Sequence, residues 1–175
     1  GLVGSEMCIR DRFKVLKIDT STMTWKKYAV SLLIVNLCLV FIGYLILRIQ
    51  SIGFLNPNGI SGMEESLSFN TIISFMTNTN LQHYAGESGL SYFSQMFVII
   101  MMMFTSAATG FSACVAMVRG LLGRNMGNFY VDFIRIINRF LLPLSMIIGL
   151  FLVWQGVPQN LNSNIQLTTI EGKFQ

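Results

Sequence analysis

Residues 28–47 read YAVSLLIVNLCLVFIGYLIL, twenty consecutive residues without a charged side chain. A helix of about 20 apolar residues is long enough to cross the hydrocarbon core of a bilayer. Trp25, Lys26 and Lys27 precede this stretch and Arg48 follows it, as is typical of side chains that anchor a helix at the membrane surface. The stretch therefore predicts a membrane-spanning helix.

Two further stretches have the same character. Residues 96–118 carry no charge and end at Arg119. Residues 140–154, FLLPLSMIIGLFLVW, reach spanning length if the helix begins near Ile134, and Pro143 is expected to kink the helix or start a turn near its entry. The fold class predicted is an all-α integral membrane protein with about three transmembrane helices.

Composition agrees with this class. Of the 175 residues, 53% are hydrophobic and 11% are charged, whereas soluble domains carry about 25% charged residues. This excludes a disordered chain and argues against a soluble enzyme domain. The motifs GxxxxGK[ST], GxSxG and HExxH are absent from the sequence, so we expect no catalytic residues and an activity other than catalysis by this chain.

The segment between the first two spans contains a short apolar run followed by a polar one. Leu67–Met76, LSFNTIISFM, is too short to span a bilayer and fits a re-entrant or buried helix. Glu64 and Glu65 suit its first turn, where negative charge meets the helix dipole. The polar run 77–82, TNTNLQ, follows directly. Such backbone is tolerated at membrane depth only where protein buries it or where it lines a water-filled cavity.

The distribution of basic residues predicts the orientation. Residues 49–118 contain no Lys or Arg, whereas basic residues precede the first span and lie between the second and third. By the positive-inside rule the N-terminal segment is cytoplasmic and the polar run enters from outside. Arg48, at the outer end of the first span, is a mild exception.

Residues 129–140 have a helical pattern of their own. The apolar positions are Phe129, Phe133, Ile136 and Phe140, and the charged positions Asp132, Arg135 and Arg139 recur on another face. This pattern favours an amphipathic helix at the cytoplasmic interface or a simple N-terminal extension of the third span, and both alternatives stay open.

For several polar or small residues inside the spans, the sequence also predicts what they contact. Asn36 should face a partner helix or a cavity, because it is polar at membrane depth. Ser106, Ala107, Ala108 and Gly110 offer a small-residue face for close helix contact. Cys38 and Cys114 lack metal-ligand spacing and are expected to be small buried hydrophobes.

The first twelve residues, GLVGSEMCIRDR, resemble translated sequencing-adapter read-through, and we expect them to be non-native. Without an initiator methionine, the chain is expected to be a fragment. The predicted organisation has six parts: 1–12, non-native; 13–27, a cytoplasmic segment; 28–118, a span–pore loop–span repeat; 119–139, a cytoplasmic interfacial helix; 140–156, a third span; and 157–175, a truncated extracytoplasmic connection.

The order span, short helix, polar turn, span is the unit of potassium-channel-like pores. A dehydrated cation needs oxygen ligands, and backbone carbonyls supply them in such pores. A short helix that ends beside the ion directs its partially negative C-terminus toward the positive charge. Asn tolerates the left-handed backbone that such a turn requires. The channel filter string TVGYG is absent. The candidate potassium filter is therefore Thr77, Asn78, Thr79 and Asn80, and a polar loop that merely connects helices is the alternative.

The strings that carry a family resemblance are Asn56-Pro57, Phe69-Asn70-Thr71, SFMTNTNLQHYAGESGLSYFSQM over residues 74–96, SAATG over 106–110, Val131-Asp132, Arg135-Ile136, Gln155-Gly156 and Gln159-Asn160. Through them, residues 25–172 closely resemble the potassium-binding A subunit of the Kdp-type potassium-transporting ATPase. The resemblance covers the N-terminal minority of the family's length.

The resemblance implies a potassium-binding and translocating subunit with four span–pore loop–span repeats around one pore, of which this chain carries the first. K+ is then the bound ion, with no organic cofactor and no other metal. The implied partners are a catalytic P-type ATPase subunit, a small periplasm-facing subunit and a possible tiny single-span subunit, all in the inner membrane of a bacterium. No nucleic acid is expected as a partner.

Gln82 corresponds to a family position just outside the filter that affects potassium selectivity. Gly86 and Glu87 are candidates for the outer mouth, although a plain turn explains them nearly as well. Two other functions remain open, a subunit of a gradient-driven potassium transporter from the same superfamily and a non-transporting membrane scaffold subunit.

Overall fold

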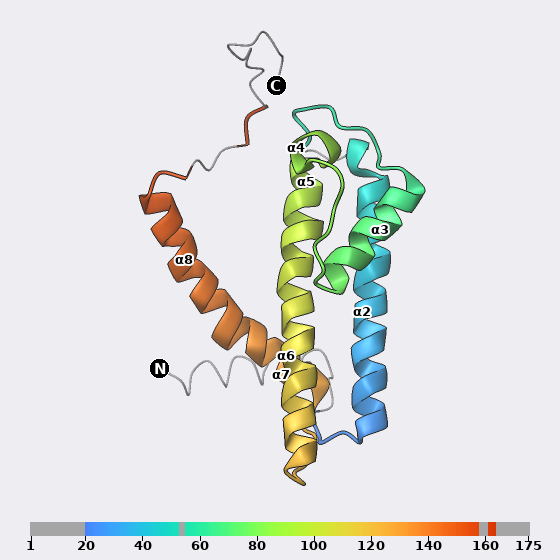
Figure 1. Cartoon of the computed structure of the whole chain (residues 1–175), viewed down its shortest axis with the longest axis vertical. Coiled ribbons are helices and arrows are strands. Elements are labelled where there is room, and N and C mark those ends of the chain that lie inside the picture. The colour runs from blue at the N-terminus through green and yellow to red at the C-terminus, as the bar shows by residue number, and fades with distance from the viewer. Residues whose placement is uncertain (1–19, 53–54, 158–160, 164–175) are drawn as a thin grey trace. The chain divides into compact units, whose positions relative to one another are not determined.

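A computed structural model describes residues 20–52, 55–157 and 161–163. Within these residues the chain is helical and contains no strand. The predicted non-native segment 1–12, residues 13–19 of the predicted cytoplasmic segment, and most of the connection 157–175 lie outside the described residues. The elements are α2 (Trp25–Arg48), η1 (Gln50–Ile52), α3 (Glu65–Met76), α4 (Gly86–Gly89), α5 (Tyr92–Ser94), η2 (Gln95–Ile100), α6 (Met101–Leu121), α7 (Phe129–Ile136), η3 (Ile137–Leu141) and α8 (Leu142–Trp154) (Figure 1).

Three helical runs in the described residues are long and apolar enough to cross a membrane: Trp25–Arg48, Tyr92–Leu121 and Phe129–Trp154. The second joins α5, η2 and α6, and the third joins α7, η3 and α8. Each contains one of the uncharged stretches from which a span was predicted and begins before it. The third run begins eleven residues before residue 140 and ends at Trp154, two residues before the predicted end of the third span. The prediction of an all-α membrane protein is confirmed.

The chain forms two compact units. The first unit comprises residues 1–36 and 107–146, and the second unit comprises residues 37–106 and 147–175. Helix α2 contributes one half to each unit, and most of α6 belongs to the first unit. The second unit contains the predicted pore loop, and the first contains the segment predicted to be cytoplasmic.

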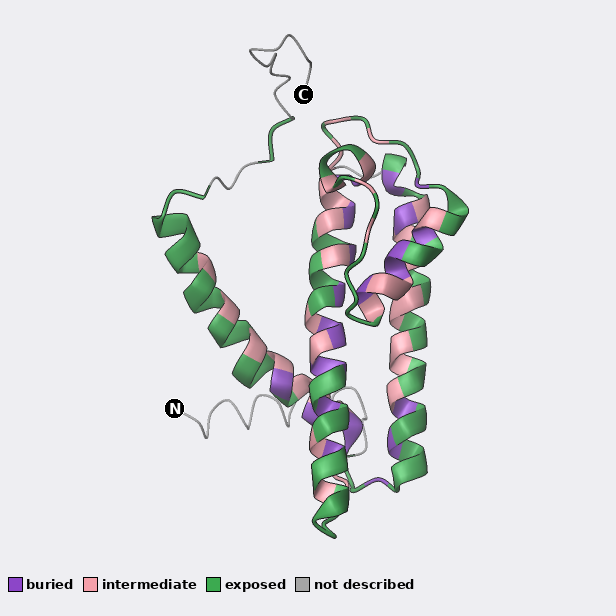
Figure 2. Ribbon diagram, in the orientation of Figure 1, coloured by how far each residue is buried: buried purple, intermediate pink, exposed green. Residues whose placement is uncertain are grey.

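The core of the second unit forms where α3 packs against the C-terminal half of α2 and the beginning of α6 (Figure 1). The buried face of α3 consists of Ser68, Thr71, Ile72 and Phe75, positions that recur at helical spacing (Figure 2). Gly43 makes the close approach possible, because a Cβ atom there would collide with Ile72 Cδ1 and lie 3.0 Å from Met102 Cε.

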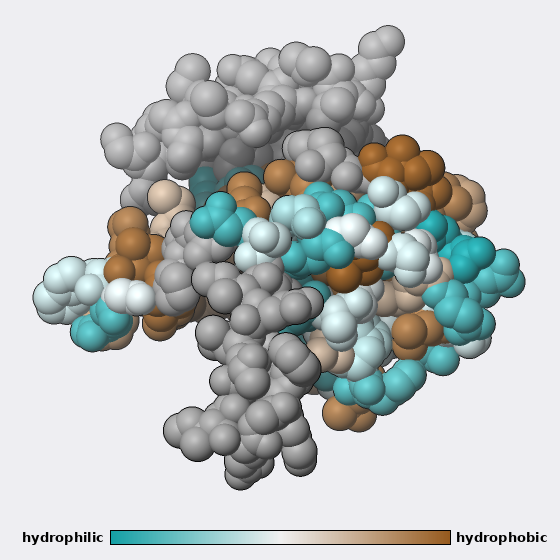
Figure 3. Space-filling model, turned by 90° about the horizontal axis from the view of Figure 1, so that it is seen from above, coloured by the Kyte–Doolittle hydropathy of each residue, from teal (hydrophilic) through white to brown (hydrophobic). Residues whose placement is uncertain are grey.

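The outer surface of the spans is hydrophobic. Large apolar side chains are exposed along α2, α6 and α8, among them Leu33, Phe41, Met117, Ile147 and Leu150. A helix that exposes apolar side chains suits lipid contact rather than water. Hydrophilic residues, in contrast, cover much of the described surface in the view from above (Figure 3).

Cys38 and Cys114 are also exposed on these helices, so the expectation that they are buried is wrong. An apolar run in a membrane helix does not indicate burial inside the protein, because the lipid-facing side is equally apolar.

The first unit is held together by an aromatic cluster and a polar network at the start of α7. Tyr28 packs edge-on against Phe129, with ring centroids 5.5 Å apart. The Asn128 side chain caps α7 by accepting hydrogen bonds from the N–H groups of Tyr130 and Val131. Asp132 forms an ion pair with Arg119, with Asp132 Oδ2 2.6 Å from Arg119 Nη1.

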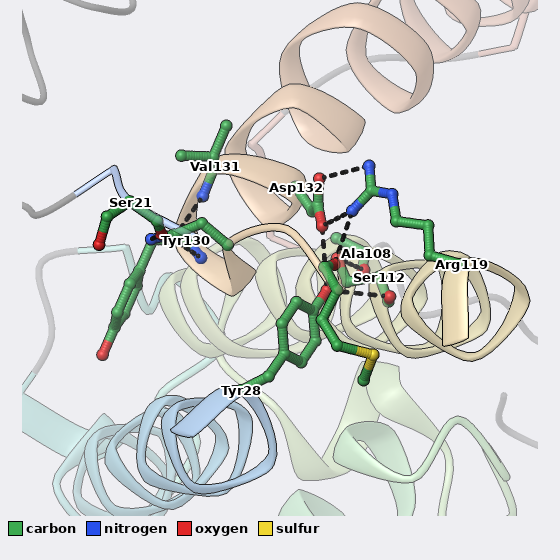
Figure 4. Close-up of polar contacts among 10 residues, drawn as sticks. Ser21, Tyr28, Ala108, Ser112, Arg119, Tyr130, Val131 and Asp132 are labelled. Carbon is green, nitrogen blue, oxygen red and sulfur yellow. Dashed lines mark hydrogen bonds and ion pairs between the residues drawn. The ribbon is translucent and has the colours of Figure 1, made fainter. Parts of the chain in front are cut away.

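Figure 4 shows that the Tyr28 ring reaches this ion pair from α2. Its hydroxyl lies 3.2 Å from Asp132 Oδ2 and 3.0 Å from the carbonyl oxygen of Ser112. The Asp132 side chain is only 8% exposed. The sequence pattern grouped Asp132 with Arg135 and Arg139 on a charged face, whereas the structure buries it, because Arg119 and Tyr28 compensate its charge.

The prediction that Asn36 faces a partner helix is confirmed, since Thr109 Oγ1 of α6 donates a hydrogen bond to Asn36 Oδ1 of α2 at 3.1 Å. The small-residue face is present in part. Ala108 is fully buried, whereas Gly110 is exposed and has nothing near the position of a Cβ atom.

Residues 129–154 form one helical run, interrupted in its hydrogen-bond pattern by the π-helical segment η3 directly before Pro143. Proline lacks an N–H group and its ring clashes with the carbonyl four residues earlier, here that of Arg139. The wider π turn accommodates this conflict, which agrees with the perturbation expected at Pro143. The location of α7 at the membrane interface stays a prediction.

Candidate ion-binding loop

Helix α3, which leads into the loop, begins at a side-chain N-cap. Glu64 is the N-cap of α3, where its carboxylate accepts hydrogen bonds from Ser66 Oγ at 2.6 Å and from the N–H of Leu67 at 3.1 Å. These hydrogen bonds, the one from Ser66 first, lower the pKa of Glu64 below its ordinary value. The negative charge also lies at the positive end of the helix dipole.

Arg48 connects the end of α2 to the same point. Its Nη1 donates to the carbonyl oxygen of Met63 at 2.6 Å, and its Nη2 lies 3.1 Å from Glu65 Oε1. This arrangement gives Arg48 a structural role at the C-terminal end of α2. These contacts offer a local reason for a basic residue at a helix end where the predicted orientation expects none.

The end of α3 turns sharply into the predicted filter. Thr77 is the C-cap residue, and its hydroxyl donates to the carbonyl oxygen of Ile73 at 2.9 Å. Asn78 and Asn80 have φ angles of 60° and 52°, and they are the non-glycine residues with positive φ in the described part of the chain. Asn is among the residues that tolerate this left-handed conformation. The expectation that asparagines of this turn adopt the left-handed backbone conformation is confirmed.

Three consecutive main-chain N–H groups, those of residues 79–81, point to a single residue, Ser74, in the last turn of α3. The N–H groups of Thr79 and Asn80 donate to the Ser74 carbonyl oxygen at 3.0 and 3.4 Å. The N–H of Leu81 donates to Ser74 Oγ at 3.0 Å.

The loop carbonyls have no such partners. Within the described residues, no hydrogen bond ends on the carbonyl oxygens of residues 77–80, and all four residues are exposed. The N–H groups of the loop are thus hydrogen-bonded within the chain, whereas the carbonyl oxygens of residues 77–80 are available as ligands. This is the arrangement that a bound cation requires.

The segment after the loop returns beside α3 (Figure 1). Gln82 is half-buried, and its Nε2 lies 3.4 Å from Ser74 Oγ. The hydroxyl groups of Thr71 and Tyr84 form a hydrogen bond of 3.1 Å. Burial raises the pKa of the Tyr84 hydroxyl, an effect that the hydrogen bond from Thr71 opposes. The structure therefore brings Gln82 next to the residues 77–80.

Gly86 and Glu87 lie further along, in the short helix α4. The carbonyl oxygen of Gly86 accepts a hydrogen bond from Gln95 Nε2 at 3.2 Å, and Glu87 is exposed. The structure places these two residues in a separate helical turn, and their role at an outer mouth stays a prediction.

The side-chain amide of Gln50, which the sequence did not indicate as important, connects three segments of the second unit. Gln50 is 1% exposed. Its Nε2 donates to the carbonyl oxygens of Ser61 and Gly89 at 2.8 and 3.0 Å, and its Oε1 accepts from the N–H of Ser91 at 3.2 Å. In the sequence, a polar residue shortly after a span is typical of a helix end that faces solvent. Only the three-dimensional contacts show that Gln50 connects separate segments. Ser74 was missed in the same way, inside an apolar run.

Comparisons with known proteins agree with the resemblance. The family model of the potassium-transporting ATPase A subunit matches residues 6–175. The chain is similar to a potassium-transporting ATPase potassium-binding subunit from Clostridium acetobutylicum, at 57% identity over 87% of this chain and 28% of that protein. Similar proteins of the same description occur in Caldanaerobacter subterraneus subsp. tengcongensis (56% identity over 86% of this chain and 27% of that protein) and Geobacillus kaustophilus (54% over 87% and 28%).

The chain thus spans a little over a quarter of the length of the curated relatives it matches. The family match covers nearly all of its residues, including every element described above. The chain belongs to the family of the potassium-transporting ATPase A subunit.

Proposed function

We propose that this chain supplies one pore loop of a potassium-binding and translocating subunit in an ATP-driven potassium uptake complex. The supporting relatives are described as potassium-binding subunits of a potassium-transporting ATPase. In this proposal K+ loses its hydration water and is coordinated by the carbonyl oxygens of Thr77, Asn78, Thr79 and Asn80. Gln82 lies beside this filter, and Gly86 and Glu87 contribute to the outer mouth.

One observation carries the proposal. The N–H groups of Thr79, Asn80 and Leu81 are all used by Ser74, while within the described residues the carbonyl oxygens of 77–80 accept no hydrogen bond. Along the loop, left-handed residues alternate with residues of negative φ, because Asn78 and Asn80 have positive φ and Thr77 and Thr79 do not. Alternating handedness turns successive peptide groups toward the same side, so the carbonyls of a short segment face one ion.

The electrostatics of α3 support the same function. Its C-terminus ends at the loop, and a helix C-terminus carries about half a negative elementary charge. The loop itself contributes no acidic side chain in residues 77–82. Selectivity then depends on the number and field strength of carbonyl dipoles rather than on a fixed carboxylate.

The partners in this proposal are a catalytic P-type ATPase subunit, a small periplasm-facing subunit and a possible single-span subunit, in the bacterial inner membrane. The N-terminal segment and residues 119–139 face the cytoplasm, and the loop faces outside. In this proposal ATP hydrolysis takes place on the partner subunit, and the sequence given contains no GxxxxGK[ST] phosphate-binding motif.

The test is growth of an uptake-deficient bacterium at limiting potassium. It carries the full-length gene that contains this chain, together with the neighbouring subunits. The proposal expects rescue at low potassium and loss of this rescue in Gln82→Arg and Asn78→Asp, with expression and assembly confirmed by immunoblotting and co-purification.

The outcomes separate the alternatives. Rescue that persists when the ATPase subunit is inactivated would indicate a gradient-driven transporter. Rescue that neither substitution alters would move the selective site elsewhere. Failure of the assembled complex to rescue growth would favour a scaffold subunit.

A further inference from the structure

We propose that Ser74 is the positioning residue that sets the geometry of the loop and thereby its preference for K+ over other monovalent cations. This inference rests on the proposed function. Ser74 does not touch the ion in this account. It acts through residues 79–82, to which both its carbonyl and its hydroxyl are bonded.

The position of Ser74 explains why its carbonyl is available. Carbonyl groups in the last turn of a helix lack the N–H groups of a following turn. Here the N–H of Asn78 bonds to Phe75 instead, which leaves the Ser74 carbonyl oxygen to accept from the N–H groups of Thr79 and Asn80. The Thr79 hydroxyl donates to the same oxygen at 3.1 Å.

The hydroxyl of Ser74 also points to the loop. A serine inside a helix often bonds back to the carbonyl four residues earlier. Ser74 Oγ instead lies 3.0 Å from the N–H of Leu81, 3.4 Å from Gln82 Nε2 and 3.1 Å from Thr79 Oγ1.

The hydroxyl groups of the threonines belong to the same network. Ser74 Oγ and Thr79 Oγ1 lie 3.1 Å apart, and either atom can be the donor. The Ser74 carbonyl oxygen is approached by the N–H groups of Thr79 and Asn80 and by the hydroxyl groups of Thr77 and Thr79, which share its two lone pairs. Both polar groups of Ser74 are therefore engaged by the loop.

This network has a consequence for the ion ligands. Each N–H group bound by Ser74 belongs to the same peptide plane as the preceding carbonyl, so the bonds to Thr79, Asn80 and Leu81 orient the carbonyls of residues 78–80 away from α3. Removing the Ser74 hydroxyl removes the hydrogen bonds to the N–H of Leu81 and to the Gln82 side chain. The peptide plane between Asn80 and Leu81 is then less restrained. The distances between the carbonyl oxygens and the ion become less fixed, and the loop distinguishes ions of different radius less well.

The experiment measures initial uptake rates of K+ and Rb+ by the full-length complex carrying Ser74→Ala, Ser74→Thr or the control Ser88→Ala. Ser88 is exposed, and its hydroxyl donates to the carbonyl of Ala85 within its own turn. For Ser74→Ala we expect the apparent KM for K+ to rise about tenfold, the loss associated with one or two hydrogen bonds. The preference for K+ over Rb+ should fall, while the maximal rate per assembled complex stays within about twofold.

Ser74→Thr retains the hydroxyl and should restore the ion preference, and Ser88→Ala should behave as the parent complex. If Ser74→Ala does not accumulate in the membrane, Ser74→Cys replaces it, because a thiol keeps the size but is a weak hydrogen-bonding group. A lower maximal rate with unchanged KM and unchanged ion preference would show a merely structural role and overturn the inference.

Asn78→Asp, measured in parallel, separates this inference from the proposed function. An altered ion preference in Asn78→Asp together with a parental preference in Ser74→Ala refutes the role of Ser74 and leaves the filter in place. A parental ion preference and affinity in Asn78→Asp, Gln82→Arg and Ser74→Ala together refutes the filter, and with it the role of Ser74.

Discussion

Breaking the ion pair between Arg119 and Asp132 should destabilise the first unit. In Asp132→Ala, the Arg119 guanidinium loses two contacts, at 2.6 and 3.2 Å, and the hydroxyl of Tyr28 loses a neighbour at 3.2 Å. Removing one member of a buried pair costs about 3–5 kcal/mol because the remaining charge is uncompensated. The Arg119 side chain is 32% exposed and can be partly hydrated, so we expect a loss of about 3 kcal/mol in the free energy of unfolding.

A double-mutant cycle tests this reasoning. The free energy of unfolding is measured for the full-length protein in mixed micelles as Asp132→Ala, Arg119→Ala and the double variant. Because the double variant leaves no uncompensated charge, it should be more stable than the sum of the single losses predicts, by about 2 kcal/mol. Arg124→Ala, an exposed basic residue of the same connection, is the matched control. Additive losses in the cycle, or a loss in Asp132→Ala no larger than that in Arg124→Ala, would refute the reasoning.

Two other substitutions and one change of pH test the second unit. Gly43→Ala should cost about 1 kcal/mol through overpacking against Ile72 Cδ1, and less in the Ile72→Val background, which removes that atom. Gln50→Ala should cost about 1–3 kcal/mol, since the buried N–H of Ser91 and the carbonyl oxygens of Ser61 and Gly89 lose their partner. Both losses are measured by unfolding in mixed micelles. Because the pKa of Glu64 is lowered from 4.5, its capping contribution is present above pH 4.5 and is lost as the pH falls through the lowered pKa. The protection factor of the Leu67 amide, its exchange rate corrected for the intrinsic effect of pH, should therefore fall in acid.

Each of these predictions has a control. Equal losses for Gly43→Ala in the parent and Ile72→Val backgrounds would contradict the packing argument. Gln155→Ala, at an exposed glutamine, should leave stability unchanged, and a similar loss there would contradict the role of Gln50. Glu64→Gln should remove the acid dependence at Leu67, and the same pH profile in this variant would contradict the assignment to Glu64.

The spans and the left-handed asparagines could be predicted because their causes are local. Twenty uncharged residues at 28–47 predict a spanning helix without knowledge of neighbours. The conformations of Asn78 and Asn80 follow from the residue type and from a short helix that must end before them.

The contacts of Gln50 and the burial of Asp132 could not be predicted, because their partners lie far away in the sequence or on an unexpected face. Gln50 contacts residues 61, 89 and 91. Asp132 follows a pattern typical of a solvated face, yet Arg119 and Tyr28 approach it from two other helices. Cys38 and Cys114 show the opposite error, since an apolar neighbourhood in a membrane helix does not indicate an interior position.

The most direct test of the account is to locate the ion. Tl+ resembles K+ in charge and size and gives a strong anomalous signal, so crystals of the full-length complex in Tl+ would reveal the site. The account predicts an anomalous peak within direct coordination distance of the carbonyl oxygens of Thr77, Asn78, Thr79 or Asn80. A peak elsewhere in the pore, with these four carbonyls out of contact with any ion, would contradict it.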